Sequence, residues 1–129
     1  MQSKLQHLIE RYQKGERMFH GLDLSGCDLS HLQLPDIDLS HSILIGACLI
    51  GTDLEWAILR DVNLTQANLT HAHLHRANLR RANLTTATLE HADLRAADLS
   101  GATIVNTVFA DSNLWGAVAP DGMSPLYLN

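Results

Sequence analysis

Residues 67–84 read ANLTHAHLHRANLRRANL, and this stretch decides the fold. A leucine returns at every fifth residue, and an alanine stands two positions before each of these leucines. The leucines continue without a break from Leu24 to Leu99, and the same spacing from Phe19 to Leu114 gives 20 consecutive apolar centres. A fixed period over most of a chain predicts an architecture built by stacking identical units.

A period of five suits neither an α-helix nor a flat strand. Residues five apart on a helix are rotated by about 500°, so the leucines would spiral around it without forming an apolar face. In an extended segment the small residue and the leucine two positions later point to the same side. Alternation with a period of two cannot continue through a repeat of five residues, so the chain must bend once per repeat to turn the next pair inward. We therefore expect coils whose sides each turn one small and one large side chain inward and pair with the next coil like parallel strands. Glycines that suit a corner of positive φ follow a centre by two positions at Gly26, Gly46, Gly51, Gly101 and Gly116.

The repeated motif A-(D/N)-L-x-x, seen at residues 67–71 and 82–86, resembles the pentapeptide-repeat protein family over about residues 17–118. The resemblance implies an all-β fold, a right-handed quadrilateral parallel β-helix with four repeats, or 20 residues, in each coil. Twenty centres then correspond to about five coils. The segment from Leu8 to Arg17 also resembles the leader of many cyanobacterial members.

The two ends of such a rod need covers, because terminal coils expose core residues and strand edges. We expect residues 1–16 to form an N-terminal helical cap, with a helix over 3–14 that Ser3 caps and Gly15 ends. The β-helix would occupy 17–118, and 119–129 would form a C-terminal cap or tail. Turns are predicted at Pro120 and Pro125. The apolar residues that could fold back over the last coil or join two rods end to end are Leu126, Tyr127 and Leu128.

The composition is globular, with 46% hydrophobic residues, 18% charged residues and a net charge of -5. An acidic balance argues against general binding to nucleic acids or anionic membranes. No apolar run is long enough to span a bilayer, and no signal peptide is visible, so we expect a cytoplasmic protein. Cys27 is expected in the core and Cys48 on the surface, so we expect no disulfide between them.

The repeat leaves no lumen for a ligand, because the inward side chains fill the coil at native packing density. We therefore expect no catalytic residues, no cofactor and no enzymatic activity. An alternative concerns a surface metal site at the cluster His71, His73 and His75, with Asp53 or Asp93 as a further ligand. The preferred interpretation is a solvated ladder of charges in which His73 lies between Asp53 and Asp93, so no metal is predicted.

Two groups of outward residues are candidate partner contacts. The second coil carries apolar residues where other coils are polar, and exposed apolar surface commonly marks a contact site. The alternative is that these residues only stabilise strand columns, with Trp56 covered by Arg76 of the next coil. The apolar group comprises Ile43, Ile45, Cys48, Ile50, Trp56 and Ile58, and the basic group comprises Arg60, Arg80 and Arg81.

The resemblance includes quinolone-protection proteins, in which an acidic rod mimics DNA in the binding saddle of a type II topoisomerase. Arginines in the middle of this chain disfavour such mimicry, which remains an alternative. The function expected from the sequence is a non-enzymatic solenoid that presents its outer faces to a protein partner of unknown identity. The rod is expected to be a monomer or an end-to-end dimer, with no nucleic-acid or membrane partner.

Overall fold

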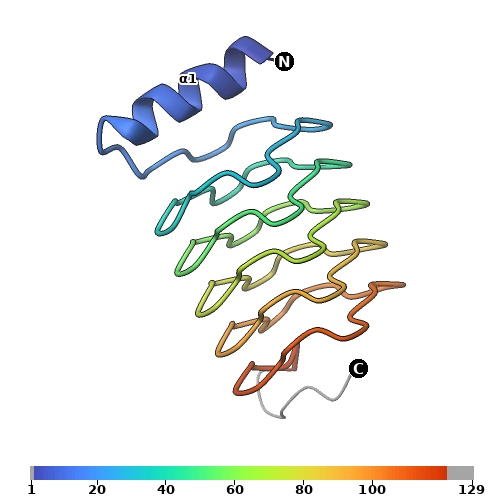
Figure 1. The fold of residues 1–129 in the computed structure, drawn as a ribbon. Coiled ribbons are helices and arrows are strands. Elements are labelled where there is room, and N and C mark those ends of the chain that lie inside the picture. The colour runs from blue at the N-terminus through green and yellow to red at the C-terminus, as the bar shows by residue number, and fades with distance from the viewer. Residues whose placement is uncertain (1, 122–129) are drawn as a thin grey trace.

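The computed structural model describes residues 2–121, which form one helix and a stack of coils (Figure 1). Helix α1 spans Gln2–Gln13 and lies across the first coil. Successive coils pair through isolated parallel bridges between residues 20 apart, from Met18 with Asp38 to Asp98 with Val118. The predicted coil of 20 residues is therefore confirmed.

Each coil has four corners, one in every repeat. The residue two positions after each centre has a φ between +54° and +74° at all positions from Gly21 to Gly116. At most of these corners the next residue's N–H donates to the centre's carbonyl, as from Cys27 to Leu24 at 3.1 Å. This combination is that of a type II turn. Fourteen of these corners hold a residue other than glycine, Trp56 and Thr86 among them, so glycine suits the corner but is not required there.

The corners shorten the strands that the sequence predicted. Only three residues lie between one turn and the next, and the middle one forms the bridge to the neighbouring coil. Within residues 2–121 the pairing therefore consists of single bridges without extended strands. The bridge residue is often Asp or Asn because its side chain also closes the following turn: Asp28 Oδ1 accepts the N–H of Ser30 at 3.0 Å, and Asn68 Oδ1 accepts that of Thr70 at 3.1 Å.

The centres and the small residues fill the inside of the coil. The leucines at the centres from Leu24 to Leu99 are at most 2% exposed, and the alanines two positions before a centre, from Ala67 to Ala97, at most 1%. Where a hydroxyl replaces an alanine it finds a backbone acceptor, as Thr52 Oγ1 donates to the carbonyl of Leu29 at 2.8 Å. No buried side-chain nitrogen or oxygen of the described residues lacks a hydrogen-bond partner. The core of the described residues is thus continuous, as the repeat predicted, and its buried polar side-chain atoms are all hydrogen-bonded.

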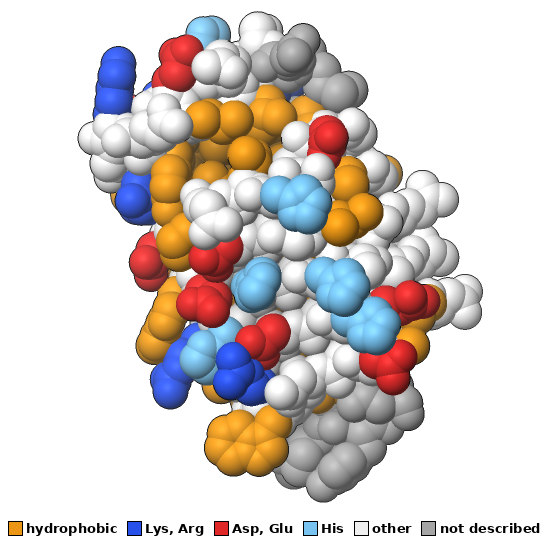
Figure 2. All heavy atoms as spheres, viewed as in Figure 1, with side chains coloured by type: hydrophobic (Ala, Val, Ile, Leu, Met, Phe, Trp, Pro, Cys, Tyr) orange, Lys and Arg blue, Asp and Glu red, His pale blue; other side chains and the backbone are white. Residues whose placement is uncertain are grey.

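Helix α1 closes the N-terminal end of this core. Leu8 is buried, and Leu5 and Tyr12 pack against the same cluster. The Tyr12 hydroxyl donates to the carbonyl of Pro35 at 2.6 Å, and Lys4 Nζ donates to that of Asp23 at 2.9 Å. Figure 2 shows hydrophobic side chains gathered between the helix and the coil beneath it. Larger residues than alanine therefore fit the small-residue position in this first coil, where Leu22 and Leu32 also join the core.

The helix ends as predicted but begins differently. Gly15 has a φ of +100°, and the N–H of Glu16 donates to the carbonyl of Arg11 at 3.1 Å, which is a Schellman motif. The expectation that Ser3 caps the N-terminus is wrong, because the helix already includes Gln2.

Both cysteines are free thiols, Cys27 buried and Cys48 half-buried. Burial raises the pKa of the Cys27 thiol. Among the described helices, none is long and apolar enough to cross a bilayer. The C-terminal cover expected from Leu126, Tyr127 and Leu128 lies outside the described residues.

Candidate functional site

The register of the coils brings most of the predicted contact residues to one of the four sides. We call this the arginine side; it comprises residues 36–41, 56–61, 76–81 and 96–101, joined by bridges from Asp38 through to Asp98. Five of the eight predicted contact residues lie on it: Trp56, Ile58, Arg60, Arg80 and Arg81.

The remaining predicted contacts lie elsewhere. Ile43 and Ile45 stand on the next side of the rod, and both are exposed. Ile50 is half-buried at a corner still further round, and Cys48 is half-buried beside it. The apolar residues of the second coil are therefore divided among several sides, and only Trp56 and Ile58 share a side with the arginines.

The aromatic part of the arginine side is a stacked pair. Arg76 Cζ lies 4.9 Å from the centroid of the Trp56 ring, one coil away, as the register predicted. Trp56 nevertheless keeps 53% of its surface exposed. The pair forms a flat, partly desolvated platform in which the arginine holds the indole in place.

Asp61 binds Arg81 of the following coil through both carboxylate oxygens. Arg81 Nε lies 2.9 Å from Oδ1, and the terminal nitrogen lies 3.0 Å from Oδ2. Nε2 of His41 lies 3.9 Å from the same carboxylate on its other side. The hydrogen bonds from Arg81 are the main reason why the pKa of Asp61 is lowered, and the Arg60 charge adds to the effect.

The other two arginines on this side differ in their partners. Arg80 reaches the carboxylate of Asp98 at 3.1 Å, away from Arg60, so the two arginines do not share a partner although they stand in one column. Among residues 2–121, no carboxylate lies within ion-pair distance of Arg60.

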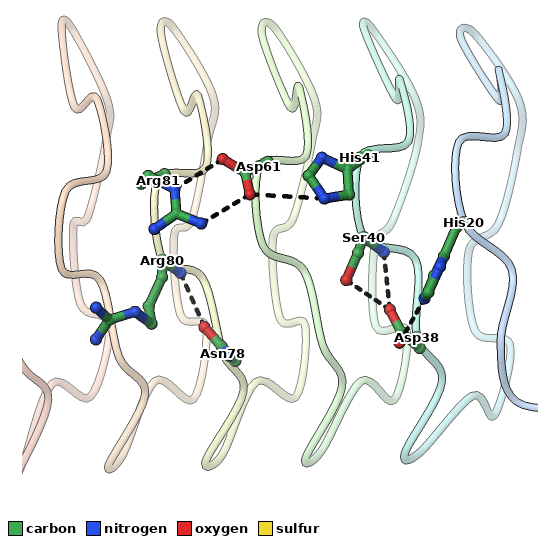
Figure 3. A network of polar contacts seen from close by, with 8 residues as sticks. All are labelled: His20, Asp38, Ser40, His41, Asp61, Asn78, Arg80 and Arg81. Carbon is green, nitrogen blue, oxygen red and sulfur yellow. Dashed lines mark hydrogen bonds and ion pairs between the residues drawn. The ribbon is translucent and has the colours of Figure 1, made fainter.

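An open hollow of about 380 Å³ indents the arginine side at its corner with the next side. Asp38 lies in it and accepts hydrogen bonds from the Ser40 N–H at 3.0 Å and the Ser40 hydroxyl at 2.6 Å, while Nε2 of His20 lies 2.7 Å from its other oxygen (Figure 3). Burial raises the pKa of Asp38, but these hydrogen bonds outweigh it and lower the pKa overall. The full lining comprises His20, Asp38, Ser40, His41, Ile58, Arg60, Asp61, Asn78 and Arg81.

The contacts predicted from the sequence include Ile58, Arg60 and Arg81 of this hollow but miss its other six residues: His20, Asp38, Ser40, His41, Asp61 and Asn78. A signal for them exists in the 20-residue register. It places His20, Ser40 and Arg60 in one column and His41, Asp61 and Arg81 in the next. Columns of this kind become visible only when the sequence is written in rows of twenty.

The histidine cluster forms a ladder. His73 bridges Asp53 below and Asp93 above, as predicted, while His71 stacks its ring on His91 with 4.9 Å between centroids. Arg95 holds Asp93 at 2.6 Å. Of the described residues, no three histidines, cysteines or carboxylates are arranged so that they could hold a metal ion.

Comparison with known families matches the chain to the family described as pentapeptide repeats (8 copies), over residues 23–61, 48–85, 57–95 and 77–116. No curated protein sequence matches the chain.

Solved structures of similar proteins include a pentapeptide repeat protein from the thylakoid lumen of Arabidopsis thaliana. It is 39% identical over 75% of this chain and 64% of its own, with a TM-score of 0.60. The protein alr5209 from Nostoc PCC 7120 is 35% identical over 86% of this chain and 91% of its own, with a TM-score of 0.41.

A third similar structure is that of QnrB1, a plasmid-mediated fluoroquinolone resistance protein. It is 18% identical over 80% of this chain and 65% of its own, with a TM-score of 0.61, and this likeness concerns the fold alone. The chain thus spans just under two thirds of the Arabidopsis protein and of QnrB1.

Proposed function

The chain belongs to the pentapeptide-repeat protein family, and on that premise we propose that it is a non-enzymatic solenoid that binds a protein partner through its arginine side. The core offers no room for a ligand because side chains fill it, so recognition must take place on the outer sides. In this proposal the coils follow the right-handed quadrilateral β-helix that the family resemblance implies.

The stack of Arg76 on Trp56 carries the proposal. Tryptophan and arginine are enriched among the residues that dominate binding at protein interfaces, where a rigid aromatic surface is buried. Here the indole is held by the arginine yet remains half-exposed. Ile58 adds apolar surface on the same side of the same coil, and the guanidinium of Arg60 follows near the end of that segment. An apolar centre with a charged rim is the anatomy of an interface.

The charges on this side weigh against mimicry of DNA. The arginine side as a whole holds four arginines and four aspartates, but its two middle segments, 56–61 and 76–81, hold all four arginines and only one of the aspartates. A surface that imitates the phosphate backbone needs the opposite sign. The likeness to QnrB1 supports a common fold and adds nothing on this point. The arginine side is therefore better suited to a protein surface that does not bind DNA than to the DNA-binding saddle of a topoisomerase.

Site-specific photo-crosslinking tests the proposal. A photoreactive amino acid is placed at Asn78, on the arginine side, or at Asn68, on the opposite side. The two asparagines are matched, because each bridges the same way and each accepts the N–H two residues further on. In a lysate of the source organism, we expect one crosslinked protein from position 78 and none of it from position 68. The same product from both positions, or only from position 68, contradicts the proposal.

A further inference from the structure

We infer that the hollow beside Arg60 is a binding site for a carboxylate group, supplied by a glutamate side chain of the partner; the source of this carboxylate rests on the proposed function. The hollow opens on the arginine side and is large enough, at about 380 Å³, to receive a side chain. It is assembled from four successive coils, because His20, His41, Asp61 and Arg81 each come from a different one.

The acidic groups of the hollow already have their partners. Asp38 accepts three hydrogen bonds, two from Ser40 and one from His20. Asp61 is held by both arms of the Arg81 guanidinium (Figure 3). Because these carboxylates are satisfied within the protein, they are poor acceptors for a basic ligand.

Arg60 is the cation of the hollow without a carboxylate of its own. The other arginines of this side are engaged: Arg80 with Asp98, Arg81 with Asp61 and Arg76 with the ring of Trp56. Of the ion pairs in the described part of the chain, none includes Arg60. A guanidinium presents five N–H donors in a planar fork that matches the two oxygens of a carboxylate. An acidic group entering the hollow therefore meets a donor set that the fold has left available.

Two further residues define the ligand more closely. Asn78 uses its side-chain oxygen to accept the N–H of Arg80 at 3.1 Å, so its NH₂ group remains as a donor. Ile58 is half-buried in the wall and offers an apolar surface beside the guanidinium. A glutamate fits this combination, because its methylene groups can cover Ile58 while its carboxylate reaches Arg60 and Asn78.

The test uses nuclear magnetic resonance of the arginine Nε–H groups in the full chain at constant ionic strength. The probe is the pentapeptide Gly-Gly-Glu-Gly-Gly with both ends blocked, and the control peptide carries Gln in place of Glu. We expect the glutamate peptide to shift the Arg60 signal in a saturable way and to leave the Arg95 signal unchanged. The glutamine peptide should shift neither. Inorganic sulfate is the second probe in the same titration. Tighter binding of sulfate than of the glutamate peptide overturns the assignment of the site to a carboxylate.

Arg60→Gln should weaken binding of the glutamate peptide at least tenfold, the loss expected for a hydrogen bond to a charged group. Arg95→Gln is the matched control, since Arg95 stands at the same position of its repeat and the same charge is removed. Arg60→Lys should bind less well than the parent, because an ammonium group lacks the planar fork. Equal shifts of all arginines, or unchanged binding by Arg60→Gln, overturn the inference.

The two proposals can fail separately. Crosslinking from position 78 with no peptide-induced shift at Arg60 leaves the protein-binding function standing and removes the carboxylate site. A shift at Arg60 together with equal crosslinking from both sides leaves the carboxylate site standing and removes the protein-binding function of the arginine side.

Discussion

Arg76 lies over the indole of Trp56, with 4.9 Å between its Cζ atom and the ring centroid, and both residues occupy the same corner of successive coils. Both also have left-handed backbone conformations, with φ values of 61° and 62°. The turn directs each side chain outward, and the distance between coils suits a stacked pair. The corners of this fold therefore order side chains along the rod as well as closing the coil.

The stack predicts a measurable coupling between these two residues. Trp56→Ala and Arg76→Gln should each lower the free energy of unfolding slightly, and the double variant should lose about 0.5–1 kcal/mol less than the sum. Urea unfolding of the four proteins measures this term. Strict additivity would show that the stack contributes nothing to stability. Partner capture should fall about tenfold or more for Trp56→Ala, whatever the coupling.

Two glycine corners separate backbone strain from steric crowding. Gly46 and Gly51 have nearly equal φ values, +65° and +64°, but a Cβ at Gly46 meets nothing within 4 Å, whereas one at Gly51 comes 2.6 Å from Nδ1 of His31. Gly46→Ala should cost about 1 kcal/mol, the strain of the left-handed conformation. Gly51→Ala should cost more, because the imidazole must also move.

Replacing His31 identifies the source of the additional cost. In a His31→Ala background, Gly51→Ala should cost the same as Gly46→Ala does in the parent protein. A persistent excess in chemical denaturation would place the conflict in the backbone instead of the imidazole.

The aspartates that close turns predict a loss of stability in acid. The hydroxyl and N–H of Ser30 lower the pKa of Asp28, so this group stabilises the fold above the pKa of the unfolded chain, about 3.9, and that contribution disappears as the pH falls through the folded value. Asp28→Asn should keep the turn, because Asn63 accepts the same two bonds from Thr65. Its melting temperature should match the parent near pH 7 and gain relative to it below about pH 4.

Asp28→Ala serves as the control for this experiment. It removes the acceptor as well as the charge, so it should be less stable than Asp28→Asn at every pH. A difference between parent and Asp28→Asn that does not change with pH contradicts the linkage.

A charge in the leucine column should prevent folding. Leu69 is fully buried, and Leu69→Lys places an ammonium group among aliphatic side chains with no partner, at a cost of several kcal/mol. That cost is comparable with the whole stability of a domain. Gln66→Lys, at an exposed corner three residues earlier, should change stability by less than about 0.5 kcal/mol. Circular dichroism during heating distinguishes the two outcomes.

The sequence predicts whatever depends on the register. The inward direction of Leu69, the stack of Arg76 over Trp56 and the approach of Arg81 to Asp61 all follow from counting in fives and twenties. The choice of partner by a flexible side chain does not follow from counting. Arg80 turns to Asp98, and Arg60 is left without a carboxylate, because both distances depend on rotamers that no periodicity specifies.

The hollow illustrates the same limit. Its residues come from columns that the register defines, but whether adjacent columns enclose a depression depends on side-chain volume and on which groups pair. Ser40 folds back on Asp38, and His20 leans onto the same carboxylate, so space remains beside Arg60. The expectation of strands was also incomplete, because the closeness of successive corners limits each side to a single bridge.

The bridge between residues 20 apart has a consequence for insertions and deletions. Adding 20 residues lengthens the rod by one coil and leaves the downstream residues in the same columns as before. Adding five residues between Asp61 and Arg76, a complete repeat that the core accepts equally well, rotates everything that follows by a quarter turn about the axis. Arg76, Arg80 and Arg81 would then stand over a different side from Trp56 and Arg60, with the same residues and the same hydrophobic core. The residues that share a side of such a rod are thus set by the number of repeats between them, and one added repeat would divide the proposed binding side without unfolding the rod.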